Sequence, residues 1–326
     1  MRLAVLYEHP EWFVPLFAAL ERRRIDVCRI DASSLQWDPA ERPAFSLLLN
    51  RMSPSAHTRG HGRAIHAAAA FIGWVEAHDV PVVNGSGPYR LELSKSAQLD
   101  LLGRLNLPCP RARVINNSLE APAAAEGLRF PVVVKPNVGG SGAGILRFNT
   151  AAELADAARR QAIDLGIDST ALVQEFLPAR NGTITRIELL GGELLYAIDI
   201  TPPAGHGFNL CPADICQTEP AAPADAFALC ATRPAMAIAA AAPRADMVDA
   251  GRRIARAAGL DICGIEYLVD ERDGAPYVYD INALSNFVTD APRIVGFDPF
   301  ERFATYIEAR LETTAGHVQS GLRTLD

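Results

Sequence analysis

The sequence has no pair of cysteines spaced for a metal site. Its six cysteines stand at positions 28, 109, 211, 216, 230 and 263, without a CxxC motif or a neighbouring histidine pattern. This spacing argues against both a zinc site and a disulfide framework. We therefore expect reduced thiols and a cytoplasmic protein.

Positive charge and long hydrophobic runs are also scarce. Lys and Arg number 31 against 38 Asp and Glu, which gives a formal net charge of −7. A nucleic-acid partner normally needs a basic surface, so we expect none. The N-terminal residues reach Glu8 before a signal-like apolar run is complete, and the segment from Ala235 to Ala242 is too short to cross a bilayer. We expect no membrane partner, and the length of 326 residues predicts two or three packed units.

What the sequence does have is a glycine-rich stretch from Phe130 to Asn149, FPVVVKPNVGGSGAGILRFN. Residues 132–134 predict a buried strand that delivers Lys135, and residues 144–148 predict a returning strand. The loop between them holds Gly139, Gly140, Gly142 and Gly144, which let backbone N–H groups approach an anion beside the charge of Lys135. In a P-loop the Lys follows the glycines and opens a helix, so this order instead indicates a glycine-rich hairpin lid over a polyphosphate. The alternative is an ordinary glycine-rich turn with a surface Lys.

The residues before this stretch predict a small open α/β unit. Strands are expected at 2–7, 27–30, 45–50 and 81–84, with helices at 12–23 and 64–77. Open α/β sheets bind ligands beyond the carboxyl ends of their strands, where Arg51 and Ser53 follow the third strand. A substrate carboxylate is a natural partner of such an Arg. A solvated loop with an incidental Arg is the equally weighted alternative.

A second Lys and a further series of elements surround the glycine-rich stretch. The helix expected at 94–105 carries Lys95 in its first turn, where a cation opposes the helix dipole and a phosphate contact would account for it. Thr150 and Glu153 form a capping box for a helix to residue 163. Later strands are expected at 171–177, 186–190, 193–200, 262–269 and 277–281, with helices at 246–258 and from 298. Residues 219–243 are typical of an exposed Ala/Pro-rich insertion, and the polar tail after Thr313 predicts a loose end.

Three oxygen-bearing side chains form a second cluster near the C-terminus. Glu266 lies on one expected strand, and Asp280 and Asn282 lie two residues apart on its hairpin partner, so the last two share a face. Hard oxygen donors of this kind suit Mg²⁺, which takes the rest of its shell from water and nucleotide phosphates. The alternative is a pair of acids satisfied by turn hydrogen bonds.

The order of these elements resembles the ATP-grasp superfamily over nearly the whole chain. The segments that look most like glutathione synthetase and the ribosomal-S6-type glutamate ligases are Gln174-Glu175-Phe176-Leu177, Thr185-Arg186, Phe208-Asn209-Leu210 and Gly264-Ile265-Glu266. The resemblance implies an α/β (α+β) ATP-grasp fold. It would comprise a Rossmann-like pre-ATP-grasp domain at residues 1–90, a central lid domain at 91–170, and a C-terminal domain at 171–326 with an insertion at 213–245.

The resemblance also implies a role for each candidate residue. The α- and β-phosphates of ATP would be held by Lys95 and Lys135, the triphosphate would be covered by Gly139, Gly140, Ser141 and Gly142, and the adenine would be read by the backbone of Gln174, Glu175, Phe176 and Leu177. Mg²⁺, or Mn²⁺ in its place, would be held by Glu266, Asp280 and Asn282. The transferring phosphoryl group would be stabilised by Arg186 and Asn209, and the substrate would lie nearer to Arg51, Ser53 and Ser285.

The implied activity is ATP-dependent ligation of a carboxylate to an amine through an acyl phosphate, with an amino acid or a peptide as the small-molecule substrate. Phosphoryl transfer is catalysed mainly by positioning and by cations around the moving charge, which suits two Lys, one Arg and Mg²⁺. Two alternatives stay open, namely an ATP-grasp enzyme of kinase or carboxylase type and a non-catalytic nucleotide-binding partner in a biosynthetic complex. The donor, the acceptor and a homo-oligomeric state are open as well.

Overall fold

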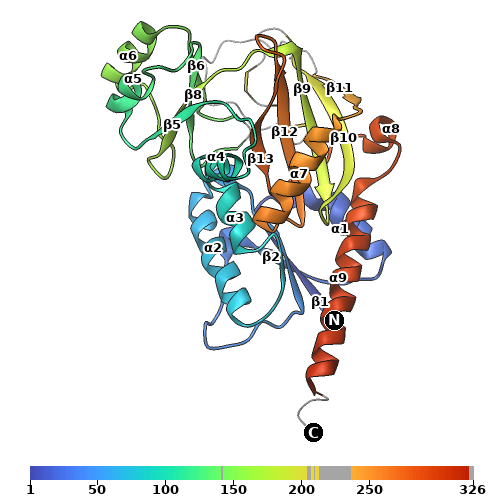
Figure 1. The fold of residues 1–326 in the computed structure, drawn as a ribbon. Helices are drawn as coiled ribbons and strands as arrows, with labels where there is room; N and C mark the ends of the chain where they lie inside the picture. Colours follow the sequence, from blue (N-terminus) through green and yellow to red (C-terminus); the bar gives the residue numbers. More distant parts are fainter. Residues whose placement is uncertain (141, 204–206, 209, 213–235, 323–326) are drawn as a thin grey trace, which may run out of the picture.

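The computed structural model describes residues 1–140, 142–203, 207–208, 210–212 and 236–322, with side chains as far as Thr314. Within these residues the strands form three sheets, which lie in different parts of the molecule (Figure 1). Each sheet draws its strands from one continuous part of the chain. The sheets are described in chain order below.

The first sheet is parallel and has the order β2-β1-β3-β4. Its strands are β1 (Arg2–Tyr7), β2 (Asp26–Asp31), β3 (Leu47–Arg51) and β4 (Val82–Val83), which confirms the four strands expected here. The helices that belong to this unit are α1 (Val14–Arg22), α2 (Gly62–Ala77) and α3 (Ser86–Glu92). Short 3-10 turns stand at Pro10–Phe13, Ala32–Ser34 and Pro54–Arg59. All five residues of β3 are buried because the sheet is covered on both faces, as parallel sheets generally are.

The second sheet is a small antiparallel one with the order β5-β8-β6-β7. Its strands are β5 (Ala112–Ile115), β6 (Val132–Pro136), β7 (Leu146–Phe148) and β8 (Ala171–Glu175). The turn Ser118–Glu120 and the helices α5 (Ala121–Ala124) and α6 (Ala151–Arg159) pack on one face around Leu154 and Val134. The hydroxyl of Thr150 accepts from the N–H of Glu153 at 3.2 Å, so the expected cap is present, but α6 ends at Arg159 rather than at residue 163.

The third sheet is antiparallel and has the order β11-β10-β9-β12-β13. It comprises β9 (Ala179–Leu190), β10 (Glu193–Thr201), β11 (Ala237–Ala240), β12 (Ile262–Asp270) and β13 (Pro276–Asn282). The helices α4 (Lys95–Arg104) and α7 (Ala245–Ala258) share a buried cluster with β9, β12 and β13. The short helix α8 (Ala291–Val295) and the long helix α9 (Pro299–Leu322) complete the chain.

The two ends of the chain pack against each other. Helix α9 runs alongside α1 (Figure 1), with Phe303 and Ile307 in one buried cluster with Leu16. Ion pairs join Arg23 to Glu308 at 2.8 Å and Arg22 to Glu301 at 2.5 Å across this contact. These contacts hold the first sheet against the third sheet, and they stabilise the position of the unit that carries Arg51.

Of two expectations about the C-terminal part, the insertion stays a prediction and the loose tail was wrong. The expected insertion at 213–245 includes Ala237–Ala240, which form β11 and pair with β10, and its last residue begins α7. The part of it at 213–235 lies outside the described residues. The tail after Thr313 is not loose as far as Leu322, because the helix α9 continues to that residue. None of the described helices is long and apolar enough to cross a membrane.

Candidate active site

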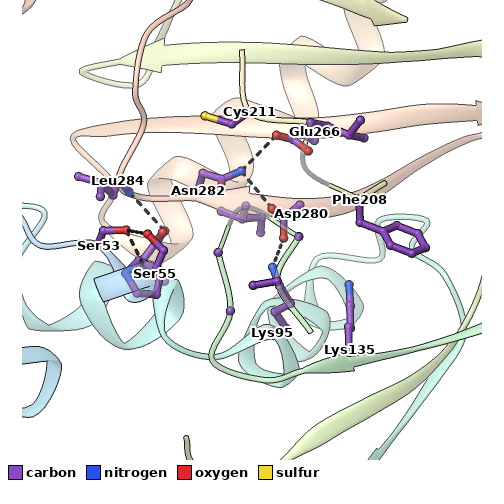
Figure 2. A pocket seen from close by; sticks show the side chains of 18 of the residues that line it. Ser53, Ser55, Lys95, Lys135, Phe208, Cys211, Glu266, Asp280, Asn282 and Leu284 are labelled. Carbon is purple, nitrogen blue, oxygen red and sulfur yellow. Dashed lines mark hydrogen bonds and ion pairs between the residues drawn. The ribbon is translucent and has the colours of Figure 1, made fainter. Parts of the chain in front are cut away.

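The main cavity of the described structure has a volume of about 150 Å³ and lies where the three sheets approach one another. Its wall takes Ser53 and Ser55 from the loop after β3, Lys135 from β6, and Arg186 and Glu266 from β9 and β12. Six charged side chains among the described residues line it, three of each sign: Lys95, Lys135, Arg186, Glu92, Glu266 and Asp280. Lys135 of the glycine-rich stretch and the acids Glu266 and Asp280 are far apart in the sequence, and they share one cavity in the structure (Figure 2).

Lys135 reaches the cavity because β6 is a buried strand in register between β7 and β8. Its side chain is only 6% exposed, and in the structure as described its amine has no ion-pair partner. Burial, reinforced by the like charge of Lys95, lowers the pKa of Lys135 to about 7. An anion bound here would restore the charge of this amine, so the position suits a phosphate.

Lys95 comes to the same place through the loop that follows β6. The N–H of Lys95 donates to the carbonyl oxygen of Asn137 at 3.2 Å, and the side-chain oxygen of Asn137 accepts from the N–H of Ser96 at 2.9 Å. The first turn of α4 is thus joined to the chain two residues beyond Lys135. Burial acts to lower the pKa of Lys95, but the ion pair with Asp280 outweighs it and the pKa is raised.

The three oxygen-bearing side chains of the third sheet converge as expected. Glu266 and Asp280 are directly paired across β12 and β13, and the amide of Asn282 lies 3.2 Å from Asp280 Oδ2 and 3.5 Å from Glu266 Oε1. Figure 2 shows Asn282 between the two carboxyl groups, with Lys95 on the other side of Asp280. Burial acts to raise the pKa of both acids: that of Glu266 is raised despite Arg186, whereas Lys95 and Lys135 hold that of Asp280 below its usual value.

Glu266, Asp280 and Asn282 fit a hard divalent cation, since carboxylate and amide oxygens are the donors that Mg²⁺ prefers, with the amide of Asn282 turned so that its oxygen faces the ion. Within the described residues no group of three or more His, Cys, Asp or Glu side chains could hold a metal ion. A cation at Glu266 and Asp280 would therefore depend on Asn282, on water and on phosphate oxygens for the rest of its shell. Its charge would also offset the repulsion between the two carboxylates.

Arg186 is held on three sides beneath the cavity. Its guanidinium donates to Glu188 at 2.6 Å, to Glu266 at 2.8 Å and to the hydroxyl of Ser285 at 3.0 Å. The fourth side is the backbone of Gly264, where a Cβ would stand 2.4 Å from Nη2. Arg186 is thus a fixed, fully ionised cation at the cavity wall, as stabilisation of a transferring phosphoryl group requires.

The glycine loop lies over the cavity and contacts the first unit of the fold. Gly139, Gly140 and Gly142 line the cavity, and Gly142 has a φ of +69°, which favours glycine. A Cβ on Gly140 would meet the Cβ of Ser55 at 2.8 Å, so only glycine permits this close approach. Two candidates, Ser141 in this loop and Asn209, lie outside the described residues.

The whole chain is similar to solved ATP-grasp structures. An ATP-grasp protein with a RimK domain from Sphaerobacter thermophilus matches with 19% identity and a TM-score of 0.64, covering 94% of this chain and 99% of its own. D-cycloserine synthetase DcsG matches with 20% identity and a TM-score of 0.68 over 95% and 100% of the two chains. D-alanine–D-alanine ligase from Bacillus anthracis matches with 16% identity and a TM-score of 0.67, covering 97% of this chain and 99% of its own. The chain has the ATP-grasp fold.

One curated relative matches in sequence. A D-alanine–D-alanine ligase of Stutzerimonas stutzeri is 29% identical over 198 residues, which cover 59% of this chain and 55% of that ligase. The match thus spans about half the length of this relative. No family model matches the chain. The ATP-grasp fold expected from the order of elements is therefore confirmed by structure rather than by close sequence similarity.

The expected adenine segment of the ATP-grasp fold does not line the described cavity. Gln174 and Glu175 end β8, and Glu175 accepts from the N–H of Arg129 at 2.9 Å. Arg147 stacks over the ring of Phe176 at 4.3 Å, and Leu177 is buried in the core. The side-chain oxygen of Gln174 is buried without a hydrogen-bond partner in the described parts of the chain. The role of this segment stays a prediction.

The three residues expected near the substrate divide into two groups. Ser53 lines the cavity, and its hydroxyl lies 2.8 Å from that of Ser55. Arg51 and Ser285 lie behind the wall instead, where Arg51 Nη2 donates to the carbonyl oxygen of Ser285 at 2.6 Å. The guanidinium of Arg51 packs near the rings of Phe13 and Phe303, at 5.2 and 5.7 Å from their centres.

Several residues in or next to the cavity had no expectation attached to them. Glu188 holds Arg186 and could have been found, because it lies two residues along the same strand face. Tyr279 donates to Glu266 at 2.7 Å and belongs to the strand of Asp280. No motif marks Ser55 or Glu92, since each reaches the cavity only through the packing of its unit against the third sheet.

Proposed function

We propose that this protein is an ATP-dependent carboxylate–amine ligase that forms an amide bond through an acyl phosphate. The observation that carries the proposal is the meeting of Lys95, Lys135 and Arg186 with Glu266 and Asp280 in one cavity beneath a glycine loop. Binding of a nucleotide would account for the two Lys and the loop. It would not account for a buried Arg186 clamped beside a cation site, which favours catalysis.

The roles follow from charge and position. Lys95 and Lys135 bind phosphate oxygens of ATP, Gly139, Gly140 and Gly142 exclude water above them, and the segment 174–177 contacts the adenine. Mg²⁺ would be held by Glu266, Asp280 and Asn282 and would supply positive charge at the phosphates. Arg186 stabilises the charge that moves with the phosphoryl group. ADP, ATP and Mg occur in complexes of relatives with this fold, which supports the choice of nucleotide and ion.

The chemistry needs no protein nucleophile. An oxygen of the donor carboxylate attacks the γ-phosphorus of ATP, the bond to the β–γ bridging oxygen breaks, and ADP leaves. The amine then attacks the acyl carbon, loses a proton, and expels inorganic phosphate. Both steps move negative charge past Arg186 and the two Lys, and preorganised cations in a site without water lower the barrier for such movement. Exclusion of water also protects the acyl phosphate from hydrolysis.

The substrate we propose is an amino acid or a peptide. The relative from Stutzerimonas stutzeri is a D-alanine–D-alanine ligase, and the ATP-grasp ligase PsnB, with 17% identity and a TM-score of 0.65, is known in complex with a minimal precursor. Hydroxyl groups of Ser53 and Ser55 at one end of the cavity offer hydrogen bonds to such a substrate. Arg51 and Ser285 support this end from behind the wall.

Hydroxamate formation tests the proposal. Protein, Mg-ATP and hydroxylamine are incubated with the standard amino acids, their 2-hydroxy counterparts and short peptides, because hydroxylamine intercepts an acyl phosphate as a coloured hydroxamate. We expect a positive donor, and we expect Arg186→Met to reduce the rate by at least about a hundredfold. Arg252→Met is the matched control, since Arg252 pairs with Glu193 at the surface and should leave the rate unchanged.

The contrary outcome is equally clear. If ATP binds to the wild-type protein and no carboxylate in the panel gives a hydroxamate or ADP, the ligase assignment fails. ADP release without any hydroxamate would instead indicate a kinase, or a simple ATPase if free phosphate is released with the ADP. Equal rates for Arg186→Met and Arg252→Met would remove Arg186 from the reaction.

A further inference from the structure

Glu92 is a buried acid at the cavity that none of the roles above uses. It is the last residue of α3 and only 8% of it is exposed, yet it lines the main cavity together with Lys95 and Asp280. It also lines a second, smaller cavity beside Asn50 and Asn84. A buried carboxylate that lines two cavities needs a hydrogen-bond donor or a cation as its partner, because burying an unpaired ionised group costs free energy.

Only one of its two carboxylate oxygens has a hydrogen bond in the described structure. Glu92 Oε2 accepts from the backbone N–H groups of Ala283 and Leu284, the latter at 3.3 Å. No hydrogen bond to Oε1 is made by the residues that the structure describes. Asn84 Nδ2 holds the carbonyl oxygen of Ala283 from the other side at 2.6 Å, so this backbone segment has a second anchor that is independent of Glu92.

Two cations among the described residues act on Glu92, but neither donates a hydrogen bond to its carboxylate. Burial, opposed by the N–H of Ala283 and reinforced by Asp280, raises the pKa of Glu92 to about 7. The two cations are Lys95, which forms an ion pair with Asp280, and Arg51, which lies behind the cavity wall and donates to the carbonyl oxygen of Ser285. A positively charged ligand would therefore gain a strong hydrogen bond at Glu92 Oε1, since hydrogen bonds between ionised partners are about twice as strong as neutral ones.

The position of Glu92 places such a ligand at the substrate end of the cavity. Leu284, which Glu92 binds, lies on the same side of the cavity as Ser53 and Ser55, whereas Lys135 lies on the other side (Figure 2). An ammonium group carries three donors, and one carboxylate oxygen with nearby serine hydroxyls can accept them. We propose that Glu92 binds a protonated amino group of the substrate, a specificity role that rests on the proposed ligase function.

The test compares amino acids with their 2-hydroxy counterparts, which lack the ammonium group. Wild-type protein and Glu92→Gln are assayed with Mg-ATP in two arms. The donor arm measures hydroxamate formation against the concentration of each acid. The acceptor arm measures ADP release with the best donor, when amino acids replace hydroxylamine as the amine. Gln keeps an oxygen that can accept from Ala283 and Leu284, and Glu126→Gln is the control at an exposed acid.

We expect Glu92→Gln to raise KM for the amino acid by about 10- to 100-fold in one arm, with little change for the matching 2-hydroxy acid or for hydroxylamine. The arm that responds tells whether the donor or the acceptor carries the bound amine. A rise that is equal for amino and hydroxy substrates, or KM values within about twofold of wild type, would overturn the proposal.

The wild-type protein tests the proposal even if the variant does not fold, which its thermal unfolding curve will show. A wild-type preference for 2-hydroxy acids over amino acids as donors, with amino acids no better than hydroxylamine as acceptors, would contradict an ammonium site. Failure of the ligase function itself looks different, because the wild-type protein would then give neither hydroxamate nor ADP with any substrate.

Discussion

Replacement of Gly264 by alanine is expected to displace Arg186 and destabilise the protein. Gly264 lies in β12, and an added Cβ would stand 2.4 Å from Nη2, 2.7 Å from Cζ and 2.8 Å from Nε of Arg186. Non-bonded atoms of this kind pack at about 3.5 Å or more. The guanidinium must therefore move by about 1 Å to admit one methyl group.

This movement is unfavourable because the guanidinium is already bonded on its other sides. Its contacts with Glu188 at 2.6 Å, with Glu266 at 2.8 Å and with Ser285 at 3.0 Å cannot all survive such a shift. Breaking a buried ion pair costs about 3–5 kcal/mol, and forcing a methyl group into a packed site costs about 1–3 kcal/mol. Since Arg186 has two acidic partners and can keep one, we expect a loss of about 2–4 kcal/mol.

Urea unfolding measures this loss, and Gly73→Ala is the matched control. Gly73 lies inside α2, and nothing stands within 4 Å of its added Cβ. The same substitution should stabilise the protein there by about 0.5–1 kcal/mol, because alanine favours the helix. If Gly264→Ala unfolds within about 0.5 kcal/mol of the wild type at an unchanged m-value, the account of Arg186 as a rigid cation is refuted.

The remaining predictions concern the charges of the cavity. The pKa of Lys135 falls from 10.5 to about 7 on folding, so the unfolded chain binds more protons between these values and stability without nucleotide should rise with pH across this window. Lys135→Met should remove that rise, which unfolding at several pH values checks; a slope equal to that of the wild type would contradict the pKa. Asp280→Asn should raise the Mg²⁺ concentration needed for half-maximal ADP release by about tenfold or more, while the exposed control Asp246→Asn should not. An unchanged Mg²⁺ profile would exclude Asp280 from the cation site.

Local patterns predicted most elements because their signals are short-range. The run Val132–Val134 predicted β6, and Thr150 with Glu153 predicted the start of α6. The strand β11 was missed because Ala237–Ala240 has little intrinsic preference for a strand, and its state is decided by backbone pairing with β10. The length of α9 was missed because polarity was taken as a sign of a loose end, although no proline interrupts residues 300–322.

The membership of the site was predictable only where residue type itself indicates chemistry. Lys, Arg and the acids of β12 and β13 stand out in the sequence, and they do meet in the cavity. Their partners across the fold do not stand out. Lys95 pairs with Asp280, 185 positions away in the sequence, and Glu92 accepts from Ala283, 191 positions away. Both contacts depend on the packing of α3 and α4 against the third sheet. The same packing leaves Arg51 behind the cavity wall, although its place after β3 favours a ligand contact.

The charges of the cavity explain why these pairings matter. Among the described residues, three basic and three acidic side chains line it, so their formal charges cancel. Lys95 and Asp280 form an ion pair with each other, so a ligand can bind either group only when this pair separates. A nucleotide with its metal ion allows a direct exchange, in which Lys95 takes a phosphate oxygen and Asp280 takes the cation. Neither group is then left unpaired in a buried site, so binding of the two ligands should be mutually favourable.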